Sequence, residues 1–452
     1  MPIDGCTSCG SHEALSRITH NDRASAGSAR IADGSSTATE NTRTSLRYKH
    51  MLRNRSSSAC FPLIAGVAFV GLNLRPFITS VGTLATSVRA ETGLSLQGMA
   101  LLTLVPMLLM GLVGFIGPSL QGAFGARRSV IGALALLCGG CFLRLFASTG
   151  WAMIATAAII GFGVAIVQAV LPGTIKRQFP KHVGAMMGLY SSMLMGGGAL
   201  GAQLSPIIAA KAGNWHVGLA WLAAPALIAA VLALCFLPAD IRSQSRRPPA
   251  GIFLKRPRTW LLMTCFGLVN GGYSSIVAWL APSYQERGWS GPESGGLLAV
   301  LAVCQALAAL VLPMLASKGE DRRPWLWATL VMQAAGFVGL AFAPDAVPTV
   351  WAALLGAGLG GCFALSMVVA LDHLPAPEQA GTLSALMQGG GFLIAAIPPW
   401  LVAVLHDVTG AYAAGWGWHL VSVAIVMVLT TQLSPKGYTR AMSSPDGEFN
   451  LA

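Results

Sequence analysis

The sequence predicts an all-α membrane protein with twelve membrane-spanning helices, arranged as two similar sets of six. Three observations lead to this fold class. Of the 452 residues, 54% are hydrophobic and only 10% are charged, whereas an ordinary soluble domain carries about 25% charged residues. Long apolar windows recur along the chain, and the second half of the sequence repeats the first at a fixed offset of 195 positions.

The apolar windows give the number of spans. A helix needs about 20 apolar residues to cross the hydrocarbon core of a bilayer, and Gly and Pro are tolerated inside such helices. Twelve windows of this kind are present, at residues 60–81, 97–117, 129–148, 150–172, 184–210, 217–237, 259–282, 294–316, 324–343, 347–371, 380–405 and 411–433.

The net charge of +12 is explained by the way the basic residues are distributed over the two sides of the membrane. With the N-terminus inside, the loops on the inner side hold fourteen Lys and Arg residues, whereas the opposite loops hold three: Arg89, Lys211 and Arg287. This asymmetry is the positive-inside rule. It predicts a multi-pass protein of the cytoplasmic (inner) membrane with both termini in the cytoplasm. Because topology explains the positive charge, no nucleic-acid partner is expected.

Polar segments divide the chain. We expect residues 1–58 to form a disordered basic cytoplasmic tail and residues 59–237 a six-helix bundle. A cytoplasmic linker at 238–258, a second six-helix bundle at 259–434 and a cytoplasmic tail at 435–452 follow. Met51 directly precedes a short basic lead into the first span and is a candidate start. Cys6, Cys9 and His12 share a metal-like spacing without a second ligand pair, so no metal site is expected.

The repeat is visible in single residues. A shift of 195 positions pairs polar and glycine residues at corresponding places of the two halves: Glu91 with Glu286, Gly93 with Gly288, Ser95 with Ser290, Arg127 and Arg128 with Arg322 and Arg323, and Pro180 with Pro375. Parallel six-helix repeats with a substrate site between them are the major facilitator architecture.

Several motifs carry a family resemblance: "GLNLRPFITSVG", "QAVLPGTIKRQF", "FGLVNGGYSSIVAWL", "DRR" after span eight, "ALDH" after span ten and "MQGGGF" in span eleven. Together they resemble the cyanate/2-nitroimidazole transporter family of the major facilitators, over residues 60–433. The resemblance implies a transporter that moves a small molecule by alternating access, with cyanate as the expected substrate. One departure lies in the loop after span two, where Gly122 stands at the place of the family's acidic residue.

Arg75 is the most unusual residue of the first span. An arginine at the centre of a membrane helix costs about 2.5 to 3.5 kcal/mol on insertion scales, so a function is expected for it. It shares a polar and small face with Thr79 and Gly82, and Pro76 removes a helix hydrogen bond beside it. The alternative is an arginine bonded to helix carbonyls or to a partner in another helix.

The repeat places Asn270 at the position that corresponds to Arg75. One cation opposite one neutral amide suits a small monoanion, because a phosphate ester would need two or more cations. Tyr273 follows one turn later, and Trp279 either walls the cavity or anchors at the interface. The predicted substrate-binding residues are Arg75, Asn73, Thr79, Gln168, Asn270, Tyr273, Trp279 and Gln388.

Charged residues at the inner ends of the spans predict a gate. The candidates are Arg127, Arg128, Arg177, Asp372, Arg322 and Arg323. The repeat pairs Arg177 with Asp372, and we expect an ion pair between them to close the cytoplasmic end. Arg127 and Arg128 also suit helix capping or lipid headgroups. A proton is the candidate coupling ion, and no nucleotide-binding loop is present.

The leading hypothesis is a secondary active or facilitative transporter of a small anion, cyanate by resemblance, acting as a monomer without a cofactor. An exporter of a nitroimidazole-like compound is the alternative within the same class. A non-transporting sensor is the alternative from another class, although the N-terminal tail supplies no ordered soluble domain. No enzyme is expected, because the spans contain no converging acid, base or metal-ligand set.

Overall fold

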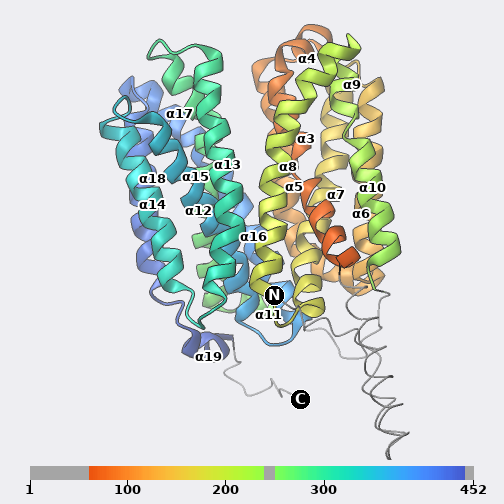
Figure 1. The fold of residues 1–452 in the computed structure, drawn as a ribbon, viewed down its shortest axis with the longest axis vertical. Coiled ribbons are helices and arrows are strands. Elements are labelled where there is room, and N and C mark those ends of the chain that lie inside the picture. The colour runs from red at the N-terminus through yellow and green to blue at the C-terminus, as the bar shows by residue number, and fades with distance from the viewer. Residues whose placement is uncertain (1–60, 239–249, 443–452) are drawn as a thin grey trace, which may run out of the picture.

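The fold consists almost entirely of helices that run in one direction or its reverse (Figure 1). The computed structural model describes residues 61–238 and 250–442. The predicted tail at 1–58, with Met51 and the Cys6 to His12 motif, lies outside the described residues, as do most of the predicted linker and the end of the C-terminal tail. Within the described residues, twelve helical stretches are long and apolar enough to span a membrane.

The spans follow the predicted windows closely, with spans two, four and eleven several residues longer than expected. In the first half they are Phe61–Thr83, Gly98–Phe124, Ala126–Phe146, Gly150–Gln178, Val183–Ala212 and Trp215–Phe236. In the second half they are Pro257–Gln285, Glu293–Ala316, Arg323–Phe342, Pro348–Asp372, Pro377–Thr409 and Ala413–Thr430.

Most spans coincide with one long helix, and these are α5 (Leu96–Phe124), α7 (Gly150–Gln178), α8 (Val183–Ala212), α12 (Pro257–Gln285), α13 (Gly291–Ala316), α14 (Arg323–Phe342), α15 (Pro348–Asp372) and α18 (Ala413–Thr430). Others combine two pieces, such as α6 (Ala126–Leu143) with η1 (Arg144–Phe146), α9 (Trp215–Ala220) with α10 (Ala223–Phe236), and α16 (Pro377–Ala395) with α17 (Pro398–Thr409). The first span ends in α3 (Pro76–Thr83), and α4 (Ala85–Thr92) follows it.

The sequence repeat has a structural counterpart at the start of spans two and eight. Ser95 and Ser290 are both N-cap residues, and their side chains accept hydrogen bonds from Gly98 N and Glu293 N. Such a cap satisfies one of the free N–H groups of a helix start. In each half a glycine with positive φ stands just before, at 67° for Gly93 and 90° for Gly288. The two halves therefore use the same turn chemistry at corresponding positions.

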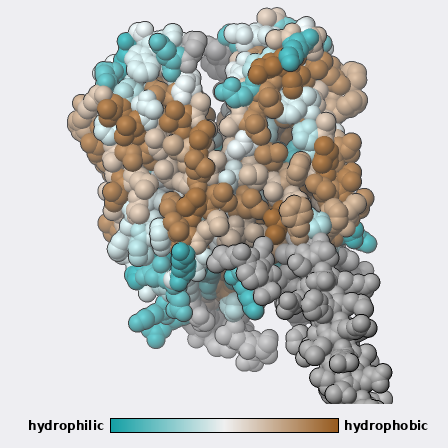
Figure 2. Space-filling model, in the orientation of Figure 1, coloured by the Kyte–Doolittle hydropathy of each residue, from teal (hydrophilic) through white to brown (hydrophobic). Residues whose placement is uncertain are grey.

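The helices form two groups that stand side by side, α3–α10 and α12–α18 (Figure 1). We call the end of the molecule that holds α11 (Ala250–Leu254) and α19 (Tyr438–Met442) the linker end, and the opposite end, with α4, α9 and α17, the far end. Apolar side chains cover the middle of the face shown, and the two groups part at the far end (Figure 2).

The two groups touch where glycines let their backbones approach. A Cβ at Gly114 of α5 would lie 2.4 Å from the Cα of Gly389 in α16, and one at Gly188 of α8 would lie 2.8 Å from the carbonyl oxygen of Leu310 in α13. Small residues at helix crossings are typical of membrane bundles. Gly173 and Gly381 meet in the same way, close to the linker end. Contact between the halves therefore runs from the linker end to the middle of the bundle.

Candidate functional site

The first span is interrupted at Arg75. Residues 61–72 are helical, residues 73–75 are not, and α3 begins at Pro76 with Arg75 as its N-cap residue. The glycine-rich face of α8 accommodates this break, because a Cβ at Gly197 would lie only 1.9 Å from the carbonyl oxygen of Leu72. Pro76, which removes a helix hydrogen bond, directly follows this break, and the break includes the arginine itself.

The Arg75 side chain reaches from the first half toward the second. Its Cζ atom lies 4.6 Å from the centroid of the Tyr273 ring and 5.8 Å from that of the Phe363 ring. A guanidinium over an aromatic face is stabilised by about 0.5 to 2 kcal/mol. Among the described residues Arg75 forms no ion pair. Its charge is thus held in place without being neutralised by a carboxylate.

Two further buried polar side chains lie on the helices α12 and α8 that pack beside this arginine. Asn270 is buried one turn before Tyr273 in α12, and its Nδ2 donates to the carbonyl oxygen of Phe266 at 2.8 Å. Tyr190 of α8 is fully buried with no hydrogen-bond partner for its hydroxyl, and it lies within electrostatic range of Arg75. From the sequence, Tyr190 shares a helix face with Met193 and Gly197 and is a weaker candidate for the cavity wall, so it is not among the predicted binding residues.

Three of the predicted binding residues use their donors to join helices. Asn73 donates to the carbonyl oxygens of Phe69 and Pro225, at 2.7 and 3.2 Å. Thr79 donates to Gly198 at 2.7 Å, and the Trp279 indole donates to Pro399 at 2.8 Å. These bonds tie the helices that carry Arg75 and Tyr273 to their own halves. They favour a positioning role for the three residues.

Gln168 and Gln388 meet at the junction of the two halves. Nε2 of Gln388 in α16 donates to the backbone oxygen of Gln168 in α7 at 3.1 Å, and both side chains are buried. By helical rise they lie about 15 Å from the linker end, whereas Arg75 and Asn270 lie about 20 Å from it. The Oε1 atom of each glutamine lacks a hydrogen-bond partner. The pair therefore joins the two halves at a level between that of Arg75 and the linker end.

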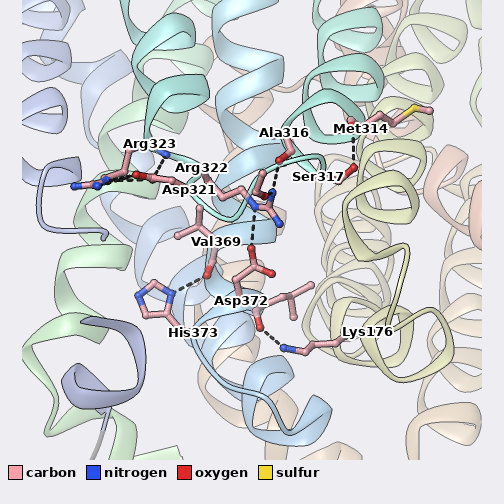
Figure 3. Close-up of polar contacts among 12 residues, drawn as sticks. Lys176, Met314, Ala316, Ser317, Asp321, Arg322, Arg323, Val369, Asp372 and His373 are labelled. Carbon is pink, nitrogen blue, oxygen red and sulfur yellow. Dashed lines mark hydrogen bonds and ion pairs between the residues drawn. The ribbon is translucent and has the colours of Figure 1, made fainter. Parts of the chain in front are cut away.

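The linker end is closed by contacts that differ from the predicted gate (Figure 3). The expected Arg177–Asp372 ion pair is not formed. Asp372 instead pairs with Arg322 at 3.0 Å, inside the second half. Arg177 pairs with Glu378 at 4.0 Å, across the two halves. The repeat correctly placed Arg177 and Asp372 at corresponding helix ends, but each residue finds an opposite charge on a different neighbouring helix.

Lys176 supplies the other link across the linker end. Its Nζ donates to the carbonyl oxygens of Leu371 and Leu374, at the end of α15 (Figure 3). A cation at a helix C-terminus satisfies free carbonyls and complements the helix dipole. Sequence reasoning missed Lys176 and Glu378 as gate residues, because each was one charge among many in the inner loops.

The other predicted gate residues bind within their own half. Arg127 donates to the carbonyl oxygen of Leu234 at the end of α10, as a helix-capping residue does, and Arg128 is exposed. Arg323 holds Asp321 through two nitrogens, at 3.0 and 2.7 Å. The first-half loop has Gly122 at the place of the family's acidic residue, whereas in the second half Arg322 and Arg323 pair with Asp372 and Asp321, so the two loops are not equivalent.

The described residues contain no group of three or more His, Cys, Asp or Glu side chains that could hold a metal ion. The site at Arg75 consists of one cation, two aromatic rings, the buried amide of Asn270 and the buried phenol of Tyr190. Such a set can bind a small anion through the guanidinium while apolar and aromatic walls exclude water.

Comparison with known proteins decides the family. The Major Facilitator Superfamily model matches residues 63–399 and 284–440. The chain belongs to the major facilitator superfamily. This major facilitator is 39% identical to the cyanate transport protein CynX of Escherichia coli over 82% of its length and 96% of that protein. It is 30% identical to the 2-nitroimidazole transporter of Escherichia coli over 81% of its length and 93% of that protein.

Solved structures agree on the fold of this major facilitator. FucP in its outward conformation matches with a TM-score of 0.69 and 14% identity, over 82% of this chain and 98% of that one. The proton:xylose symporter XylE matches with a TM-score of 0.71 and 14% identity, over 83% of this chain and 96% of that one. At this level of identity the likeness concerns the fold alone, and the predicted two-repeat, twelve-helix class is confirmed.

Proposed function

We propose that this transporter carries a small monoanion, in the first place cyanate, across the cytoplasmic membrane by alternating access. The observation that carries the proposal is the charge of Arg75, which lies at the junction of the halves without a carboxylate partner among the described residues. The 39% identity to a cyanate transport protein supports the substrate. The matching relatives are transporters, which supports a carrier over a membrane sensor or an enzyme.

The chemistry of the site supports a single negative charge. One guanidinium offers a bidentate donor fork for one anion, and Asn270 adds neutral hydrogen-bonding capacity. The contacts with Tyr273 and Phe363 orient the guanidinium but leave its positive charge uncompensated. An anion that reaches Arg75 therefore gains a charge-assisted hydrogen bond, worth about 1.5 to 3 kcal/mol. A multiply charged anion would find only part of its charge balanced.

The contacts between the halves support the transport cycle. We propose that the linker end faces the cytoplasm, since the excess of Lys and Arg lies in its loops. Both termini then lie inside, and the structure corresponds to a state closed toward the cytoplasm. Opening that side requires the loss of the Gln388–Gln168 hydrogen bond, the Arg177–Glu378 ion pair and the Lys176 bonds. We propose that the monomer performs this cycle.

A second candidate function is export of a nitroimidazole-like compound. Two observations favour it, namely the 30% identity to a 2-nitroimidazole transporter and the aromatic pair of Tyr273 and Phe363 beside Arg75. A flat aromatic ligand stacks well on such rings. A nitro group would also accept hydrogen bonds from the guanidinium.

Transport by the purified protein in proteoliposomes separates the two candidates. The proposed function predicts saturable uptake of labelled cyanate, inhibited by other small linear monoanions and indifferent to 2-nitroimidazole. Movement of labelled 2-nitroimidazole without movement of cyanate would overturn the proposal in favour of the second candidate. Empty liposomes and liposomes with heat-inactivated protein serve as controls for leak.

A further inference from the structure

Tyr190 has a buried hydroxyl that no group of the described residues satisfies. The side chain is 0% exposed, and its Oη atom has no hydrogen-bond partner. A buried polar group is normally paired, because an unpaired one loses its bonds to water and gains none. Tyr284, an equally buried tyrosine, follows this rule, since its hydroxyl donates to the carbonyl oxygen of Pro344 at 2.6 Å. The missing partner of Tyr190 therefore requires an explanation.

Packing places Tyr190 between the broken first span and the second half. A Cβ at Gly71, four residues before Arg75, would lie 2.9 Å from the backbone oxygen of Tyr190 and 3.4 Å from its ring. On the same helix α8, Gly188 meets the backbone of α13 in the second half. A Cβ at Gly198 would lie 3.4 Å from the Cβ of Arg75. Tyr190 thus belongs to the helix that packs along the break and touches the other half.

The Tyr190 phenol and the Arg75 guanidinium both have hydrogen-bond donors to offer. The guanidinium lies within electrostatic range of the phenol and forms no ion pair among the described residues. A guanidinium has only N–H donors, and a phenol without a neighbouring acceptor has its O–H free. The two side chains therefore leave room in their bonding for a third group that accepts from both.

A small anion is the acceptor that suits both donors. Cyanate has an acceptor atom at each end, oxygen or nitrogen, and it has no donor of its own that would need a partner. Hydrogen bonds to a charged group are shorter and stronger than those between neutral groups. A water molecule would also accept from the phenol, but it brings two O–H donors for which Arg75 has no acceptor. An anion therefore satisfies the pair more completely than water does.

We propose that Tyr190 is a substrate-binding residue whose hydroxyl donates to the anion held by Arg75, and that this bond selects anions that are strong hydrogen-bond acceptors. The inference rests on the proposed transport of a small monoanion and adds a specificity-determining residue to it. Arg75 attracts any monoanion through its charge. Tyr190 distinguishes among them, because its neutral donor stabilises only those that accept a strong hydrogen bond.

Linear monoanions of different acceptor strength distinguish this role from a purely structural one. A site built to hydrogen-bond its ligand discriminates against analogues that cannot form the bond. Thiocyanate has a sulfur atom where cyanate has oxygen, and sulfur is a weak acceptor. Azide has the same number of valence electrons as cyanate and carries a nitrogen at each end. The Tyr190 hydroxyl should therefore favour cyanate and azide over thiocyanate.

The test is calorimetric titration of the purified full-length protein with cyanate, azide and thiocyanate. Tyr190→Phe removes the hydroxyl and keeps the ring that packs beside Gly71. We expect it to weaken the binding of cyanate and azide by about 10- to 100-fold and that of thiocyanate by less than about threefold. Because the hydroxyl has no partner among the described residues, the ligand-free variant should melt at the wild-type temperature or above it.

Tyr284→Phe is the matched control, because it removes a hydroxyl that is bonded to Pro344. It should bind all three anions as wild type does and melt at a lower temperature. Unchanged affinities in Tyr190→Phe would overturn the proposal, and so would an equal loss for all three anions, which would indicate a structural role. A wild-type protein that binds none of the anions would contradict the proposed function itself, and the role of Tyr190 with it. The two failures are thus distinguishable.

Discussion

The guanidinium carbon of Arg75 lies 4.6 Å from the centre of the Tyr273 ring, and the two residues belong to opposite halves of the molecule. This contact joins the broken first span to α12 where the two repeats face each other. Any movement of one half against the other changes it. The residue that we assign to substrate binding is therefore also a point at which substrate and conformation are coupled.

Substitution of Tyr273 tests that contact. Tyr273→Leu removes the aromatic face and about 1 to 2 kcal/mol of cation–π stabilisation, so we expect the apparent KM for the anion to rise by about 5- to 30-fold. Tyr273→Phe keeps the ring and should stay within about threefold of wild type. The measurement is concentration-dependent uptake in proteoliposomes. Equal kinetics for the leucine and phenylalanine variants would contradict this role of the ring.

The hydrogen bond between Gln388 and Gln168 predicts that its loss changes the population of open and closed states. Gln388→Leu removes the hydrogen bond to Gln168 across the halves, so the state open at the linker end should become more populated. Labelling of cysteines introduced at that end measures the population. Gln333→Leu is the matched control, because Gln333 is equally buried and donates to Gly358 within the second half. Similar labelling of both variants would argue against a role for the Gln388–Gln168 hydrogen bond in holding the two halves together.

Charge exchange tests the gate. Arg177 and Glu378 form the ion pair across the linker end, so Arg177→Glu and Glu378→Arg should each reduce uptake and their combination should restore part of it. Exchange of Arg177 with Asp372 should give no rescue, because Asp372 already pairs with Arg322. Rescue by the second combination and none by the first would show that the pairing expected from the repeat describes the working gate.

The burial of His373 leads us to predict that the stability of the folded protein changes with pH. Burial lowers the pKa of His373 to about 4, the Val369 carbonyl opposes this shift, and Arg258 and Lys176 add to it. The folded protein therefore resists protonation that the unfolded chain accepts below about pH 6.5, and stability should fall as pH drops from there toward 4. His373→Gln should flatten the decrease in melting temperature between about pH 7 and pH 5. An unchanged slope would count against a buried neutral histidine.

The sequence predicted the twelve spans and the repeat because composition and periodicity record them directly. Corresponding residues such as Ser95 and Ser290 have the same structural role, so the offset of 195 positions also carried local information. The position of Arg75 at a break followed from Pro76, whose ring cannot donate a helix hydrogen bond. The helix is fully interrupted there, and glycines on α8 leave room for the interruption.

The pairings between side chains were harder to predict. Arg177 and Asp372 occupy equivalent helix ends, yet their partners depend on how the helices tilt and cross, which periodicity does not encode. The contact between the Glu91 carboxylate and the His216 ring, at 3.4 Å, was missed for the same reason, since the two residues are 125 positions apart in the chain. Arg144, at the end of span three, is likewise fully buried, and it donates to the carbonyl oxygen of Phe77 in span one, a contact that the sequence pattern does not encode.

Uptake of labelled cyanate by proteoliposomes that contain wild type, Arg75→Ala, Arg75→Lys or Arg128→Ala tests the central claim most directly. Loss of a charge-assisted hydrogen bond predicts that Arg75→Ala lowers kcat/KM by about 10- to 100-fold. Arg75→Lys should be intermediate, because it keeps the charge without the bidentate fork. Arg128→Ala, which removes an exposed cation, should transport as wild type does. Wild-type uptake by Arg75→Ala would contradict the account.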